Sequence, residues 1–98
     1  MPVLKQLESA IEARAVAKIK KLGVMSRKMN GMGYRGWPDR LFILPGGKSV
    51  FIEFKRPGGT LTALQAHIHE ELKAKDHVVW VCSNADAAYM IIKSEMMG

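Results

Sequence analysis

The residues with the clearest chemical potential are two acids and a lysine in the middle of the sequence: Asp39 and, fourteen residues later, the run Glu53-Phe54-Lys55. Residues two apart on a strand point to the same side, so Glu53 and Lys55 share one face, about 6.6–6.8 Å apart, while Phe54 points into the opposite layer. Mg²⁺ prefers one or two carboxylates with waters and a substrate phosphate, and a lysine can orient or deprotonate the attacking water. The pattern therefore indicates metal-assisted hydrolysis.

An Asp followed at a loose distance by Glu-x-Lys also arises by chance. The alternative interpretation is an exposed ion pair between Glu53 and Lys55, worth at most about 1 kcal/mol. The segment SVFIEF around Glu53 is otherwise apolar on both of its faces, so at least one face is expected to be covered. A carboxylate in a covered strand needs a partner or a metal. This placement favours the metal site.

Helical and strand periodicities predict the elements that must position these residues. In chain order they are helix 2–22, strand 24–30, strand 39–45, strand 48–55, helix 61–75, strand 77–82 and helix 85–96. Pro45, Gly46 and Gly47 predict a tight antiparallel hairpin, which brings Asp39 toward Glu53. The strand 77–82 is β-branched and aromatic enough to be predicted as buried. The order αβββαβα predicts an α/β fold with a mixed central sheet flanked by helices.

Length and charge limit the classes of function. The 98 residues suit one domain, 1–98, with a single buried cysteine, Cys82. The sequence contains neither a long apolar segment nor an export signal, so we expect a cytoplasmic protein without a membrane span. Residues 1–60 carry a net charge of +8 (12 basic, 4 acidic) and residues 61–98 carry −2 (3 basic, 5 acidic). This asymmetry fits a polyphosphate partner such as nucleic acid, although solvated lysines kept for solubility are an equal alternative.

Two acids of the first helix compete for a role in the site. The apolar stripe of this helix includes Leu4, Leu7 and Ile11. At about 100° per residue, Glu8 lies about 40° from the centre of the stripe and Glu12 about 80° away. Glu8 is therefore the candidate ligand, with a favourable charge near the helix N-terminus as its alternative role. Glu12 is predicted to be solvated.

The second helix offers one candidate and two residues that we set aside. Its apolar face is predicted from the recurrence of Leu61, Leu64, Ile68 and Leu72. Gln65 has the spacing of a capping box with Thr62, which by itself explains its presence, and it also lies where its amide can reach Lys55 or a metal-bound water. His67 and His69 diverge by about 200° on a helix, so they cannot chelate one metal together. Both histidines are predicted to lie on the surface.

Basic and aromatic residues surround Asp39 in the sequence. Lys28 is a candidate ligand of the phosphate next to a cut, or one more solvated lysine. Arg35 and Arg40 are candidate phosphate contacts, although Arg40 equally suits a carboxylate partner. Trp37 either stacks on an exposed base or packs over the edge of the sheet. Lys28, Arg35 and Arg40 are therefore the candidate DNA contacts.

The run GWPDRLFILPGGKSVFIEFKRPGGTLTALQAHIHEEL resembles the VRR-NUC domain of the PD-(D/E)xK nuclease superfamily, especially its short stand-alone bacteriophage forms. One departure is Trp37, where the family commonly has a smaller apolar residue. The matching positions cover nearly the whole chain and are Glu8, Gly23, Lys28, Gly36, Pro38, Asp39, Arg40, Gly46, Gly47, Glu53, Lys55 and Gln65.

The resemblance implies a restriction-endonuclease-like core and a Mg²⁺- or Mn²⁺-dependent endonuclease acting on branched DNA such as four-way junctions. It implies that Asp39, Glu53, Glu8 and the carbonyl of Phe54 bind metal, while Lys55 and Gln65 position the attacking water. Because one site cuts one strand, symmetrical incision requires a homodimer. Its expected interface lies on the last helix, at Tyr89, Met90, Ile91, Ile92 and Met96. The alternatives are a non-catalytic DNA-binding module and a nicking nuclease that reads sequence.

Overall fold

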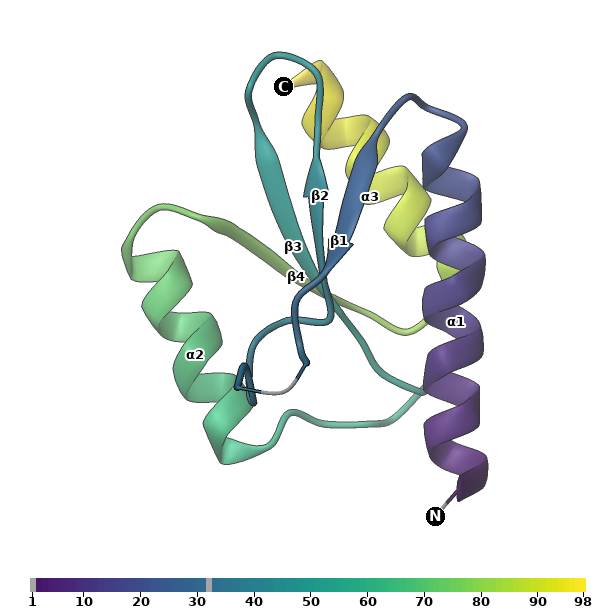
Figure 1. Ribbon diagram of the computed structural model, residues 1–98, viewed down its shortest axis with the longest axis vertical. Helices are drawn as coiled ribbons and strands as arrows, with labels where there is room; N and C mark the ends of the chain where they lie inside the picture. Colours follow the sequence, from purple (N-terminus) through teal and green to yellow (C-terminus); the bar gives the residue numbers. More distant parts are fainter. Residues whose placement is uncertain (1, 32) are drawn as a thin grey trace.

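The computed structural model describes residues 2–31 and 33–98, with side chains from residue 6 onward, so Leu4 of the predicted stripe lies outside the described side chains (Figure 1). The elements follow the predicted order αβββαβα; all are slightly shorter than predicted except the last helix, which is one residue longer. They are α1 (Pro2–Lys20), β1 (Met25–Lys28), β2 (Arg40–Ile43), β3 (Ser49–Phe54), α2 (Ala63–Ala74), β4 (Val78–Cys82) and α3 (Ala85–Met97).

The four strands form one mixed sheet in the order β1-β2-β3-β4. The pairs β1–β2 and β2–β3 are antiparallel. β4 runs parallel to β3, because α2 makes the crossover between them. The predicted hairpin is confirmed: the Leu44 amide donates to the Lys48 carbonyl at 2.8 Å, and Gly46 and Gly47 adopt φ of 89° and 87°. This left-handed conformation is open to glycine at little steric cost. The predicted α/β fold is thus confirmed.

Helices cover both faces of the sheet. In Figure 1, α1 and α3 lie on one side and α2 on the other. Cys82 is buried, as predicted, and its burial raises the pKa of the thiol to about 11. The main core fills the layer between the sheet and the α1–α3 pair, and its apolar members are Ala15, Ile19, Val24, Phe42, Leu44, Val50, Ile52, Phe54, Cys82, Ala85, Ala88 and Ile92.

Some predictions of burial are wrong. Trp80 and Val81 of β4 are 44% and 46% exposed, because β4 is an edge strand whose outer side no other strand covers. Leu7 is exposed because the first turns of α1 extend beyond the sheet (Figure 1). Leu64 of α2 is nearly half exposed at the start of its helix. Within residues 2–31 and 33–98, each helix is too short or too polar to cross a membrane.

Candidate active site

The β2–β3 hairpin brings Asp39 to Glu53. Arg40 pairs with Ile52 in the ladder, so Asp39, one residue before β2, lies level with the last residues of β3. There the backbone N–H of Phe54 donates to Asp39 Oδ2 at 2.7 Å, and the side-chain amide of Asn30 donates to Asp39 Oδ1. Asp39 is buried, and this desolvation raises its pKa although the Phe54 N–H opposes the shift. The predicted approach of the two acids is therefore present in the structure.

A polar cavity of about 250 Å³ opens at this end of the hairpin. It brings together most of the residues singled out from the sequence, including both acids and the lysine of the Asp…Glu-x-Lys pattern. Its lining comprises Glu8, Ser9, Glu12, Lys28, Asn30, Asp39, Glu53, Phe54, Lys55 and Gln65. We call it the catalytic pocket.

Glu53 is the most deeply buried acid of the catalytic pocket, with 2% of its surface exposed. Its Oε2 lies 3.6 Å from Lys55 Nζ and accepts a hydrogen bond from Gln65 Nε2 at 3.2 Å, while its Oε1 has no hydrogen-bond partner among the described residues. Desolvation, followed by the charge of Asp39, raises the pKa of Glu53 to about 8 despite the nearby Lys55. Burial therefore disfavours a second negative charge in this pocket, and the Glu53 carboxyl is mostly protonated near pH 7.

Gln65 forms the predicted capping box, and its side-chain amide contacts Glu53 beside Lys55. Its side-chain oxygen accepts a hydrogen bond from the backbone N–H of Thr62 at 2.9 Å, and its backbone N–H donates to Thr62 Oγ1 at 3.1 Å. The two bonds complete the capping box of α2. The oxygen is thereby committed to the cap, so the amide nitrogen turns toward Glu53. The start of α2 thus orients a side chain of the catalytic pocket.

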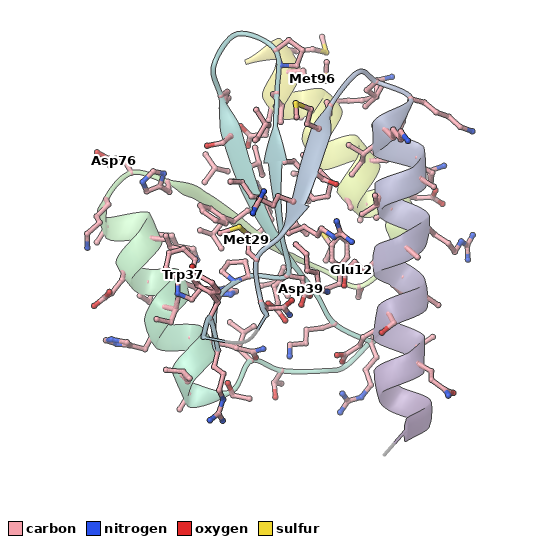
Figure 2. The ribbon with its side chains drawn as sticks, viewed as in Figure 1. Glu12, Met29, Trp37, Asp39, Asp76 and Met96 are labelled. Atoms are coloured by element: carbon pink, nitrogen blue, oxygen red, sulfur yellow. The ribbon has the colours of Figure 1, made fainter. Side chains whose placement is uncertain are left out.

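The two acids of α1 have different surroundings from those predicted. Glu8 lines the catalytic pocket and accepts hydrogen bonds from the backbone and side chain of Arg56, both at 3.2 Å. Glu12 is not solvated, because only 8% of its surface is exposed. Its carboxylate forms ion pairs with Lys28 Nζ at 2.8 Å and with Arg40 Nε at 2.7 Å. The prediction was wrong because helical periodicity measures distance from the apolar stripe and does not show which cations the sheet places opposite. Figure 2 shows Glu12 beside Asp39, between α1 and the sheet.

The three predicted DNA contacts lie at different places. Lys28 lines the catalytic pocket and pairs with Glu12, so it is not simply a solvated lysine. Arg40 pairs with the carboxylate of Glu12, in agreement with the alternative role stated for it. Arg35 is exposed and lines a neighbouring cavity together with Trp37, whose ring packs against Phe51 with centroids 6.1 Å apart.

His69 is a site neighbour that the sequence reasoning missed. It is 2% exposed rather than on the surface, and its Nε2 lies 3.9 Å from Glu53 Oε1, with neither atom hydrogen-bonded in the described residues. Burial, with the nearby Lys73 and Lys55, lowers the pKa of the imidazole. The spacing of four residues from Gln65 places both on one helical face, and this signal would have found it.

The donor set suits a hard divalent cation. Carboxylates are the protein ligands that Mg²⁺ and Mn²⁺ favour. Burial, followed by neighbouring acids, raises the pKa values of Asp39 and Glu53, and a bound cation would favour their charged forms. In the described part of the chain, however, no three His, Cys, Asp or Glu side chains already converge as a metal cluster. Glu8 accepts a hydrogen bond from the backbone N–H of Arg56, and Asp39 accepts one from the backbone N–H of Phe54. The chemistry of the pocket fits a metal, and ion binding would compete with these contacts.

A mixed sheet whose hairpin sets an aspartate beside a Glu-x-Lys motif, with helices on both faces, defines the PD-(D/E)xK class of nucleases. No family model matches the chain. A phage protein named "Putative nuclease p44", from Acyrthosiphon pisum secondary endosymbiont phage 1, is 38% identical over 84 residues, which cover 86% of this chain and 90% of that protein. A solved structure described as "VRR_NUC domain" matches with a TM-score of 0.79 and 27% sequence identity, covering 89% of this chain and 95% of that one.

The chain belongs to the VRR-NUC family, and it is a nuclease of that type. The family resemblance noted in the sequence is thereby confirmed.

Proposed function

We propose that the protein is a Mg²⁺- or Mn²⁺-dependent endonuclease that cuts branched DNA, with four-way junctions as its substrate and a homodimer as its active form. The observation that carries the proposal is the buried pair of acids, Asp39 and Glu53, beside Lys55 in one polar cavity. Two like charges in a desolvated site are unfavourable without a cation, and Lys55 alone leaves the pKa of Glu53 at about 8.

Asp39 and Glu53 are the proposed metal ligands, joined by Glu8 and the carbonyl oxygen of Phe54. All four residues line the catalytic pocket. A divalent ion held by these residues would supply a Lewis acid, to activate water and to stabilise charge on the phosphate. A carboxyl group binds a metal ion in its deprotonated form, so Glu53 would have to lose its proton when an ion binds. The ion would also compete with Arg56 for Glu8.

Lys55 and Gln65 are the proposed positioning groups for the reaction. The ammonium of Lys55 lies near Glu53 Oε2 with little exposure to solvent, so it can hold the attacking water and offset charge that develops on the phosphate. Gln65 fixes the same carboxylate oxygen from the start of α2. In-line attack on phosphorus breaks the bond to the 3′ oxygen, which leaves a 5′ phosphate and a 3′ hydroxyl.

Lys28, Arg35 and Arg40 are the proposed DNA contacts at the rim of the site. Lys28 and Arg40 are held by Glu12, so their positive charges are fixed close to the pocket rather than mobile in solvent. Arg35 is exposed on the adjacent loop. Contacts of this kind, to phosphates, position DNA without reading its sequence. A junction has two strands to cut, so two sites related by a twofold axis are required.

Incision of a four-way junction in Mg²⁺, Mn²⁺ or EDTA tests the catalytic part of the proposal. We expect metal-dependent nicks with 5′ phosphates on junctions of unrelated sequence. We expect Lys55→Ala to lower the single-turnover rate at least about 100-fold, because it removes the group that acts on the water, while junction affinity is largely kept.

Lys75→Ala is the matched control for Lys55→Ala, because Lys75 is exposed at the far end of α2. It should cut at the wild-type rate. Wild-type protein that binds junctions without any metal-stimulated cut would instead identify a non-catalytic DNA-binding module. Cuts at one fixed sequence irrespective of DNA shape would identify a sequence-reading nuclease.

A further inference from the structure

A second cavity adjoins the catalytic pocket on the α2 side. It has a volume of about 520 Å³, and Asn30 and Gln65 line both cavities. Its other walls include Arg35 and Trp37 of the loop before β2 and Leu64 of α2. We propose that this cavity receives one unpaired base of the DNA, from the nucleotide next to the bond that is cut. This inference rests on the proposed function and names the feature of branched DNA that the site recognises.

The walls of this base cavity are held in place by packing. Gly36 has a φ of 85°, and a Cβ atom there would lie 2.6 Å from Leu64 Cγ, so the loop backbone rests directly on α2. The ring of Trp37 packs against Phe51 of β3, and the backbone N–H of Trp37 donates to the Tyr34 carbonyl at 3.3 Å. Figure 2 shows Trp37 between the loop and α2. The cavity is thus formed before DNA arrives.

The chemistry of the walls suits a nucleobase. Trp37 offers a partly exposed indole and Leu64 a nearly half-exposed apolar side chain. Arg35 offers an exposed guanidinium, a planar cation that stacks on bases and attracts phosphate. Among the described residues that line the cavity there is no carboxylate, so nothing there repels a nucleotide. Aromatic stacking of this kind accepts any base, because every base has a π-face.

The position of the cavity restricts the DNA that can use it. A base within a duplex is stacked and paired, and its removal from the helix costs a few kcal/mol, least where the base is already unpaired. Since the cavity shares Asn30 and Gln65 with the catalytic pocket, the inserted base belongs to a nucleotide adjacent to the reacting phosphate. The protein would therefore favour DNA that is open beside the cut, which is what a branch point provides.

Abasic scanning of the DNA tests the inference with the protein fold unchanged. The probe is a junction in which each nucleotide around the branch point, where the cut is expected, is replaced, one at a time, by an abasic sugar that keeps its phosphate. Binding is measured with the non-cutting Lys55→Ala protein that also carries Trp80→Phe, so that Trp37 is the sole tryptophan. We expect one position beside the cut at which loss of the base weakens binding about 5- to 100-fold and abolishes quenching of Trp37 fluorescence.

A variant that fills the cavity provides the second arm. Ala63 is exposed and lines the base cavity but not the catalytic pocket, so Ala63→Phe should occlude the cavity without touching the proposed catalytic residues. Ala74→Phe places the same side chain at an exposed position in the last turn of α2 and is the matched control. We expect Ala63→Phe alone to erase the difference between base-containing and abasic DNA.

The outcomes separate this inference from the proposed function. Wild-type incision with no position-specific base effect overturns the base cavity and leaves the nuclease proposal standing, and so does a base effect that persists in Ala63→Phe. If abasic and normal DNA bind equally tightly, so that only the phosphates contribute to binding, the base cavity is also overturned. Base-dependent quenching of Trp37 without incision by the wild type supports the cavity and contradicts the catalytic proposal.

Discussion

Glu53 occupies the least favourable electrostatic environment of any acid in the site. It lies in the sheet with 2% of its surface exposed, close to Asp39, and only one of its carboxylate oxygens is satisfied by described residues. Gln65 and Lys55 face that oxygen, and His69 faces the other. Such a group is neutral near pH 7 without metal and becomes a strong ligand once a cation is bound.

The stability of the metal-free protein should fall as the pH rises from about 4.5 to about 8. The pKa of Glu53 is about 8 in the folded chain, compared with 4.5 as its ordinary value, so across this range the folded state holds a proton that the unfolded state has lost. With more protons bound to the native state, the free energy of unfolding decreases by up to about 1.4 kcal/mol per pH unit. Urea unfolding in EDTA at several pH values measures this slope.

Glu53→Gln is the control for that slope, because the amide cannot ionise. The variant should lose the contribution of Glu53. What remains is the contribution of Asp39, whose raised pKa acts in the same direction, and that of His69, whose lowered pKa acts in the opposite direction. In the wild type, Mg²⁺ should restore stability above pH 7. An unfolding free energy that increases from pH 5 to pH 8 in EDTA would contradict the assigned burial of Glu53.

Glu8 and Glu12 should respond differently to replacement by alanine. Glu12→Ala leaves the charges of Lys28 and Arg40 without their partner, so we expect a loss of about 1–3 kcal/mol in unfolding free energy. Glu8→Ala should change stability by less than about 1 kcal/mol, because its partner Arg56 is partly exposed. Only Glu8→Ala should lower apparent Mg²⁺ affinity while the fold is retained. Urea unfolding and metal titrations of incision separate the two.

At the residue scale, the sequence predicted the acids, the lysine and the amide of the site but not what surrounds them. Asp39, Glu53 and Lys55 follow from a motif with local spacing. The burial of Glu12 and His69 depends on partners 16 or more residues away in the sequence: Lys28 lies on β1 and Glu53 on β3. Helical periodicity does not show such partners, and Glu12 was assigned to the surface for this reason. For His69 the periodicity does hold a signal, because His69 shares a helical face with Gln65.

At the scale of elements, the hairpin was the most predictable part because its turn and both strands lie within one short segment. Its register then fixes the place of Asp39. Burial along β4 and at Leu64 was not predictable in the same way. An apolar run does not show whether a strand is central or at an edge, and β4 is an edge. Leu64 packs against the loop backbone at Gly36, and nearly half of its surface stays exposed.

The C-terminus of α2 contains a residue in an unfavourable conformation. Asp76 has a φ of 66° in the cap that follows Lys75, where its N–H donates to Lys73 and the His77 N–H donates to Leu72. Glycine is the residue that this type of helix end favours. We expect Asp76→Gly to stabilise the protein by about 0.5–1 kcal/mol, which is about 2–8 °C in Tm for a chain of this size.

Lys75→Gly is the matched control for Asp76→Gly, since Lys75 has a φ of −99° and glycine offers no relief there. Calorimetry of the two variants compares them directly. Equal or lower Tm for Asp76→Gly than for Lys75→Gly would show that the left-handed residue is not strained.

At the scale of the whole molecule, α3 offers only part of the dimer surface expected from the sequence. Ile92 is a core residue and Tyr89 and Ile91 pack against the core, whereas Met90 is 61% exposed and Met96 is also exposed. An interface on α3 therefore centres on the two methionines. Exposed apolar side chains of this kind suit a contact between copies, although scattered ones also occur on monomers.

We expect light scattering at micromolar concentration to give the mass of a dimer. Met90→Lys should shift the protein toward monomer without loss of folded structure, because it places a charge in the proposed contact. Met25→Lys is the matched control, an exposed methionine on β1 at the other edge of the sheet. A monomeric wild type would refute the dimer, and equal effects of the two variants would place the interface elsewhere.

The Pro45–Gly47 turn is a suitable position for a label, because the hairpin places it far from the candidate active site. It lies at the opposite end of β3 from Glu53, about 17 Å along the strand, and Figure 1 shows it far from the start of α2. Its residues are exposed, and its two glycines need no neighbouring side chain to hold them. A fluorophore or a surface tether attached there would report on single molecules while leaving the DNA path free.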